Sequence, residues 1–257
     1  MSWTIETQGD VAVVVMNTNA VNKMNGQFFD DLHEAFDRLD REFPRLPIVL
    51  TAVGKTFSAG LDFEDVFPRF ATRDTAVITA WFERFRETLL RPFLCQRRTV
   101  AAINGNAYAG GLILALACDV RLAAASPLRF AINEVPVGIP MPGVYTEMVR
   151  HAVGTAAAQE AILSGRVYSL EQGRELGFVH RVVPPEQLVD EAVKEAAIIR
   201  PDCFAVYAAS KRALQRPALR AIEGDGLADD RAAIEAVVDP GSIRAHLAAI
   251  ARLKSKS

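Results

Sequence analysis

The chain has 257 residues, of which 50% are hydrophobic and 23% charged, with 29 Lys and Arg against 31 Asp and Glu. This apolar fraction and a net charge of −2 exclude a disordered chain, and they give no electrostatic reason to expect a nucleic acid or an anionic membrane as partner. Three scattered cysteines, Cys95, Cys118 and Cys203, are typical of free thiols in a reducing compartment.

The N-terminus is predicted to form a β-hairpin and then a helix. Residues 4–7 and 11–16 are rich in strand-forming residues, and a Gln-Gly-Asp turn separates them. Asn25 is a suitable helix cap, and large apolar residues follow it at spacings of three and four as far as Phe43. No run of about 18 apolar residues and no secretory signal pattern is visible, so a cytoplasmic protein without a membrane partner is expected.

Further along, short apolar runs alternate with helical patterns. Strands buried on both faces are predicted at residues 48–53, 99–103 and 120–124, with helices between them over 77–89 and 112–117. This alternation predicts an α/β fold with a largely parallel sheet.

From Pro142 onward helical patterns dominate, over residues 145–152, 155–163, 170–176, 186–199 and on to Leu253. We therefore expect one continuous fold, with an α/β core over residues 1–195 and a helical region over 196–257.

Several cofactor and nucleophile motifs are missing. Gly54-Lys55-Thr56 is similar to the end of a phosphate-binding loop, but Val49 stands where that loop needs glycine. No G-x-G-x-x-G follows a predicted strand, and Thr56 replaces the first glycine of a G-x-S-x-G nucleophile elbow. The four histidines have no metal-binding spacing. No bound metal or separate cofactor is expected.

Two glycine-containing turns follow predicted neighbouring strands. Residues 57–62 (F-S-A-G-L-D) follow the strand at 48–53, and residues 104–111 (N-G-N-A-Y-A-G-G) follow the strand at 99–103 and open a helix. Small residues let a ligand approach the backbone, and free N–H groups at such turns can bind a developing oxyanion. Each turn taken alone also fits an ordinary strand-to-helix connection.

Glu134 is a lone carboxylate in an apolar neighbourhood. Burial would raise its pKa and suit it to act as a general base near neutral pH. Local sequence equally allows a solvated loop acid or an ion pair with Arg129.

Together these segments resemble the crotonase (enoyl-CoA hydratase/isomerase) superfamily from the hairpin to about residue 215. The matching segments are residues 57–62, residues 101–119 and residues 170–179, in the order found in that family. The resemblance implies a ββα spiral core with a helical C-terminal trimerisation region, an acyl-CoA thioester substrate, and a homotrimer or a dimer of trimers. Coenzyme A would arrive as part of the substrate.

The resemblance also implies roles for individual residues. The Leu61 and Gly110 N–H groups would form the oxyanion hole, and Glu134 would be catalytic. Substrate and coenzyme A contacts would come from Ala20, Val21, Ala59, Gly60, Asp62, Phe63, Asn106 and Ile113.

The acid/base positions favour one branch of the family. Hydratases of this family carry a second glutamate three residues after the oxyanion glycine, where this chain has Ile113. A single glutamate in an N-E segment, with an aliphatic residue at the other position, is similar to the Δ3-Δ2-enoyl-CoA isomerases of fatty-acid β-oxidation. Three alternatives stay open: a hydratase whose second acid is Glu147 or Glu64, another acyl-CoA reaction, and a non-catalytic module that binds RNA. Phe63, Phe67, Phe70, Trp81 and Phe82 fit either a fatty-acyl tunnel or ordinary core packing.

Overall fold

Residues 2–254 are described by the structure, which is a computed structural model containing three β-sheets. In the large sheet β1 and β2 are antiparallel and all other neighbours are parallel, as predicted. Its strands, in spatial order, are β1 (Thr4–Gln8), β2 (Val11–Met16), β4 (Ile48–Ala52), β7 (Thr99–Ile103), β9 (Val120–Ala124) and β12 (Arg181–Val183).

Two smaller sheets accompany it. One has the order β11 (Tyr168–Ser169), β10 (Arg129–Ala131), β8 (Asn106–Tyr108) and β5 (Thr56–Ser58), and the other pairs β3 (Lys23–Met24) with β6 (Gly60–Leu61). In the chain, β5 follows β4, β8 follows β7 and β10 follows β9. Strands β5, β8 and β10 lie in this same order in the second sheet. Each repeat thus adds one strand to each sheet, so the chain winds as a spiral of ββα units, the crotonase fold.

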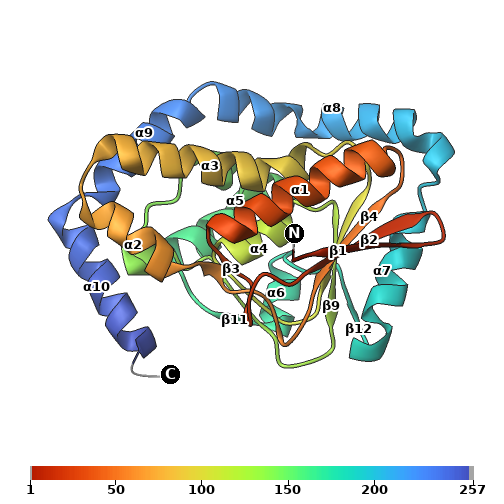
Figure 1. Ribbon diagram of the computed structural model, residues 1–257, viewed down its shortest axis with the longest axis horizontal. Helices are drawn as coiled ribbons and strands as arrows, with labels where there is room; N and C mark the ends of the chain where they lie inside the picture. Colours follow the sequence, from red (N-terminus) through yellow and green to blue (C-terminus); the bar gives the residue numbers. More distant parts are fainter. Residues whose placement is uncertain (1, 255–257) are drawn as a thin grey trace.

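The helices cover these sheets (Figure 1). They are α1 (Gly26–Glu42), α2 (Phe63–Ala71), α3 (Thr75–Leu94), α4 (Gly110–Leu116), α5 (Gly143–Ser164), α6 (Leu170–Glu175), α7 (Leu188–Ala197), α8 (Phe204–Glu223), α9 (Gly226–Val237) and α10 (Pro240–Lys254). Short 3-10 turns lie at η1 (Val135–Val137), η2 (Pro185–Gln187) and η3 (Pro201–Cys203). None of these described helices is long and apolar enough to cross a membrane.

Local chemistry explains the first helix. The Asn25 side chain accepts a hydrogen bond from the Phe28 N–H at 3.1 Å, as expected of an N-cap, and α1 ends just before Pro44. The predicted helices at 145–152 and 155–163 form one element, α5, with a break at Gly154, whose φ of 79° is outside the helical region.

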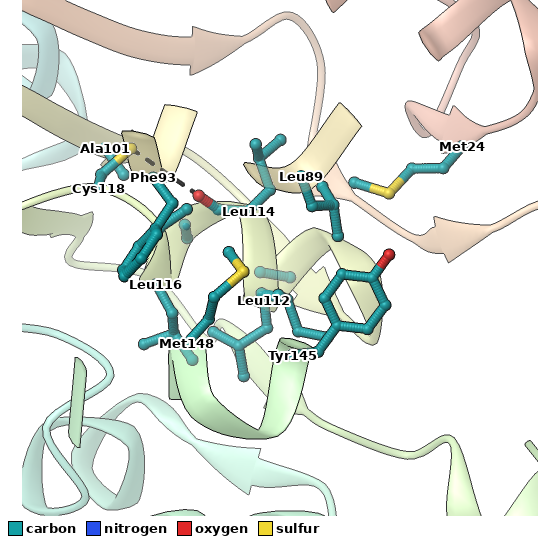
Figure 2. Close-up of a cluster of buried hydrophobic side chains, with 14 of the residues drawn as sticks. Met24, Leu89, Phe93, Ala101, Leu112, Leu114, Leu116, Cys118, Tyr145 and Met148 are labelled. Carbon is teal, nitrogen blue, oxygen red and sulfur yellow. Dashed lines mark hydrogen bonds between the residues drawn. The ribbon is translucent and has the colours of Figure 1, made fainter. Parts of the chain in front are cut away.

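Alternate residues of the buried strands face opposite sides of the large sheet. Val11 and Val13 of β2 pack toward α7, whereas Ala12 and Val14 face the main core beneath α1, α3 and α4. Figure 2 shows the centre of that main core, where Leu112 and Leu116 of α4 lie against Met148 of α5.

The C-terminal helices are present as predicted. In Figure 1, α8 and α9 cross one side of the molecule and α10 turns back beside α2. Helix α10 contacts both α2 and η1, the turn that directly follows Glu134. The division expected between residues 195 and 196 falls inside α7 and stays a prediction, and residues 1 and 255–257 lie outside the described part of the chain.

Candidate active site

The two glycine-containing turns lie against each other. A Cβ atom on Gly60 would stand 2.7 Å from the Tyr108 carbonyl oxygen and 3.3 Å from the Gly110 nitrogen. Gly60 also has a φ of +76°, which an L side chain rarely adopts. On Gly111 a Cβ would stand 2.4 Å from the Ser58 carbonyl oxygen. The small residues of both turns therefore permit this close approach.

Two backbone N–H groups at this junction are not used in the hydrogen bonds of β6 with β3 or of helix α4. The Asp62 N–H donates to the Met24 carbonyl at 3.0 Å, so the alternation of a parallel strand points the Leu61 N–H away from β3. Gly110 is the first residue of α4, and its N–H has no acceptor within that helix. Leu61 and Gly110 thus meet the local requirement for oxyanion-hole donors.

Ala109 sets the orientation of the Gly110 N–H and was not predicted from the sequence. Its φ of 50° and ψ of −129° are strained for a residue with a side chain. The Ala109 N–H donates to the Ala131 carbonyl at 2.7 Å, which holds the turn on β10. An alanine gives no sequence signal for a positive φ.

Glu134 lies directly beside these turns, at the start of η1. Its side chain is buried with 6% of the residue exposed, and its Oε2 atom has no hydrogen-bond partner among the described residues. Burial raises the pKa of Glu134 from its ordinary value to about 7. The alternative of a solvated loop acid is wrong, and the described chain supplies no ion-pair partner such as Arg129.

A small cavity of about 40 Å³ joins the turns to Glu134. Its lining residues are Ala59, Leu61, Phe63, Ala109, Asn133, Glu134, Val137 and Ile139. Glu134 is the one carboxylate in that lining as far as the structure describes the chain. The walls are otherwise mostly hydrocarbon, which suits a proton transfer that must not exchange with water.

The other predicted site residues differ in their position relative to the first turn. Ala20 is exposed, and the Val21 carbonyl accepts the Ala59 N–H at 3.0 Å, so this segment lies beside the first turn. The Asp62 carboxylate caps α2 through the Glu64 N–H at 3.2 Å and lies 3.6 Å from the Lys23 ammonium group. Asp62 therefore has a structural role in addition to any substrate contact.

Asn106 and Ile113 do not line the cavity. The Asn106 side chain accepts the Arg129 N–H at 2.9 Å, which links β8 to β10. Ile113 is 1% exposed within α4. The cavity residues that sequence reasoning missed are Ala109, Asn133, Val137 and Ile139; only Asn133, next to Glu134 in the N-E pair, carried a visible signal.

Of the two candidates for a second acid, one is paired with a basic side chain and the other is exposed. The Glu147 carboxylate lies 2.6 Å from the Arg150 guanidinium, and Glu64 is exposed at the start of α2. Neither lines the cavity. Of the aromatic residues considered for an acyl tunnel, Phe63 lines this cavity. Phe70 packs instead against Trp81 and Phe82 at ring-centroid distances of 5.7 Å.

Residues 6–247 match the sequence profile of the enoyl-CoA hydratase/isomerase family. The chain belongs to this family. A putative enoyl-CoA hydratase of Thermus thermophilus is 34% identical over 86% of this chain and 85% of its own length. The mouse mitochondrial enoyl-CoA delta isomerase 1 is 29% identical over 73% of this chain and 65% of its own length.

The crystal structure of human mitochondrial Δ3-Δ2-enoyl-CoA isomerase covers 100% of both chains with a TM-score of 0.90 and 24% sequence identity. At that identity the likeness shows the shared crotonase fold. Some relatives of this chain are named hydratases and others isomerases. The reaction of this family member is therefore inferred from the chemistry of its own site.

Proposed function

We propose that this protein is a Δ3-Δ2-enoyl-CoA isomerase, which moves the double bond of a 3-enoyl-CoA into conjugation with the thioester carbonyl during fatty-acid β-oxidation. The observation that carries the proposal is Glu134: a single buried carboxylate in the lining of an apolar cavity, whose Oε2 atom has no hydrogen-bond partner in the described chain. A pKa of about 7 suits a group that must both accept and return a proton near neutral pH.

The mechanism needs only these groups. The thioester carbonyl oxygen accepts hydrogen bonds from the Leu61 and Gly110 N–H groups, which makes the α-carbon more acidic. Glu134 removes a proton from that carbon, and the electrons spread over a dienolate whose oxyanion the two donors stabilise. The protonated Glu134 then gives a proton to the γ-carbon. One proton leaves and one returns, so no other reactant is consumed.

Hydration needs one more functional group in the site than isomerisation does. Water must be held and deprotonated by a second group, and in this chain the position equivalent to the hydratases' other glutamate carries Ile113. Glu147 and Glu64, the remaining candidates, do not line the cavity. The alternative of an enoyl-CoA hydratase is therefore less well supported, although the 34% identical relative bears that name.

Substrate binding completes the proposal. We assign coenzyme A contacts to the Ala20–Val21 segment, Ala59, Gly60, Asp62 and Phe63, because this backbone lies beside the oxyanion donors. Coenzyme A arrives with the substrate, and no separate cofactor is required by the mechanism. The homotrimer expected of the family stays a prediction.

The test compares two reactions on matched acyl chains. The value of kcat/KM for isomerisation of a 3-enoyl-CoA is measured beside that for hydration of the 2-enoyl-CoA of equal length. Isomerisation is expected to be faster by more than about tenfold, since Ile113 cannot activate water. A hydration rate equal to the isomerisation rate, or above it, would restore the hydratase.

A further inference from the structure

A second, larger cavity of about 270 Å³ lies between α3, the start of α5 and α9. Phe82 and Arg86 of α3, Tyr145 of α5 and Asp230 of α9 are among its lining residues. The mechanism above uses none of these side chains.

Only one aromatic layer separates this cavity from the proposed oxyanion hole. A Cβ on Gly110 would stand 3.2 Å from the Phe85 ring. The ring centroids of Phe85 and Tyr145 are 4.9 Å apart, and Tyr145 lines the cavity. The cavity therefore lies on the far side of these two rings from Gly110.

The cavity contains buried polar atoms that the protein leaves unpaired. Tyr145 is 1% exposed, and its hydroxyl group has no hydrogen-bond partner in the described chain. Figure 2 shows its ring beside Leu112 and its hydroxyl on the side of the ring nearer to Met24. The Arg86 Nε and the Asp230 Oδ1 also make no hydrogen bond in the described chain, and the Arg86 Nε lies 3.8 Å from the Asp230 Oδ2 in a long ion pair. A buried polar group without a hydrogen bond is destabilising, so the Tyr145 hydroxyl beside this long ion pair indicates a polar ligand.

The charges around the cavity select the type of ligand. The Arg86 guanidinium lies 3.8 Å from the Asp230 carboxylate, and the exposed Glu83 and Arg231 add one charge of each sign. The lining therefore has no net charge that would favour an anion or a cation. It offers both donors and an acceptor, which together match a hydroxyl group.

We propose that this cavity receives the distal part of the acyl chain and selects acyl-CoA thioesters whose chain carries a hydroxyl group there. The inference rests on the proposed acyl-CoA site but not on which reaction Glu134 performs. It names a substrate class: hydroxylated acyl chains, in preference to plain alkyl chains of the same length.

Binding of unreactive, saturated acyl-CoAs tests the inference separately from the chemistry. Two series of increasing chain length are compared by calorimetry, one ending in a methyl group and one in a hydroxyl group. At the length that reaches the cavity, the hydroxylated ligand is expected to bind about tenfold more tightly, because it pairs groups that an alkyl chain leaves unpaired. Equal or tighter binding of the alkyl series at every length overturns the proposal.

Tyr145→Phe is the matched variant, since it removes one oxygen that has no partner in the described protein. The tenfold ratio between the two ligands is expected to shrink to about twofold or less. Tyr168→Phe is the control, because the Tyr168 hydroxyl bonds Ser164 at 3.0 Å outside the cavity and its loss leaves the ratio unchanged. A ratio that survives Tyr145→Phe contradicts the inference.

Asp230→Asn provides a second, independent test. It keeps the shape of the side chain but leaves the Arg86 charge without its ion-pair partner. The preference is expected to move from a distal hydroxyl toward a distal carboxylate. Unchanged selectivity in this variant also contradicts the placement of the acyl chain. Loss of the isomerase reaction with retention of these binding ratios would count against the proposed function alone.

Discussion

Two buried charged regions of this fold are built in opposite ways. Beneath α8, the Asp119 carboxylate accepts hydrogen bonds from the Thr99 N–H at 2.8 Å and the Thr99 hydroxyl at 3.0 Å, and lies 2.8 Å from the Lys211 ammonium group. Nearby, the Arg121 guanidinium donates to three backbone carbonyls, those of Phe178, Cys118 and Gly177. In contrast, the Oε2 atom of Glu134 has no partner in the described chain.

This contrast distinguishes charged groups that stabilise the fold from a carboxylate that is available for proton transfer. Buried charges that only hold a fold together are paired and hydrogen bonded, because an isolated charge is strongly destabilising. Glu134 carries that cost, and the consequence is a pKa of about 7 and, in the lining of the cavity, an Oε2 atom without a hydrogen bond in the described chain. An unpartnered carboxylate is expected where the missing partner is a substrate proton.

The largest expected effect comes from Glu134→Gln. The amide has nearly the same shape but cannot accept a proton from the α-carbon, so kcat for isomerisation should fall by at least about 10³-fold. Steady-state kinetics with a 3-enoyl-CoA measures the loss, and binding of a saturated acyl-CoA should persist. Glu147→Gln is the matched control, because Glu147 pairs with Arg150 and does not line the cavity. A Glu134→Gln enzyme that keeps more than about a tenth of kcat would refute the assignment.

Lys211→Met affects the opposite region. It leaves the Asp119 carboxylate without its ammonium partner, and the free energy of unfolding should fall by about 3–5 kcal/mol. The activity of the protein that remains folded should not change, since Lys211 does not line the cavity at Glu134. Denaturant unfolding at fixed pH measures the first quantity and the kcat per folded molecule the second. A stability loss below about 1 kcal/mol would mean that this network is not stabilising.

The pH dependence of stability sharpens the comparison. Because burial raises the folded-state pKa of Glu134 from 4.5 to about 7, the folded protein holds this proton more tightly than the unfolded chain does. The associated stability is fully present below pH 4.5 and is lost as pH rises through about 7; the span is about 3 kcal/mol. Unfolding measured across this range should show that slope, and Glu134→Gln should flatten it. Over the same range kcat/KM should rise with pH, since only ionised Glu134 accepts the proton.

How much of the fold could be predicted from the sequence depends on the length of each element. The long apolar runs of β4, β7 and β9 and the capped helix α1 are local patterns, and the structure confirms them. Strands β5, β6, β8, β10 and β11 have only two or three residues, so they are too short to show a periodicity. They were reached only through the family resemblance, which implied a ββα spiral.

The site was predictable only in part for the same reason. The glycine turns and Glu134 are visible because small residues and a lone acid stand out from their neighbours. The choice between an unpaired Glu134 and an ion pair with Arg129 depends on tertiary packing, which no local pattern encodes. Tyr145 and Asp230 are 85 positions apart in the numbering and share a cavity only because α9 packs on the start of α5.

The smallest expected change comes from Ile113→Glu, which puts a carboxylate at the position where the hydratases of the family carry their other glutamate. Ile113 is 1% exposed, so the new acid is buried and the free energy of unfolding should fall by about 1–3 kcal/mol. The repulsion between two buried carboxylates raises one pKa further, so one of them stays protonated at neutral pH. Hydration relative to isomerisation should therefore rise only partially, by about tenfold, when both rates are measured on matched acyl chains. Ile113→Gln is the control, because it adds a polar group of similar size that cannot deprotonate water. An equal gain in both variants would show that polarity rather than a second base limits hydration, and that the missing carboxylate is not what separates this enzyme from a hydratase.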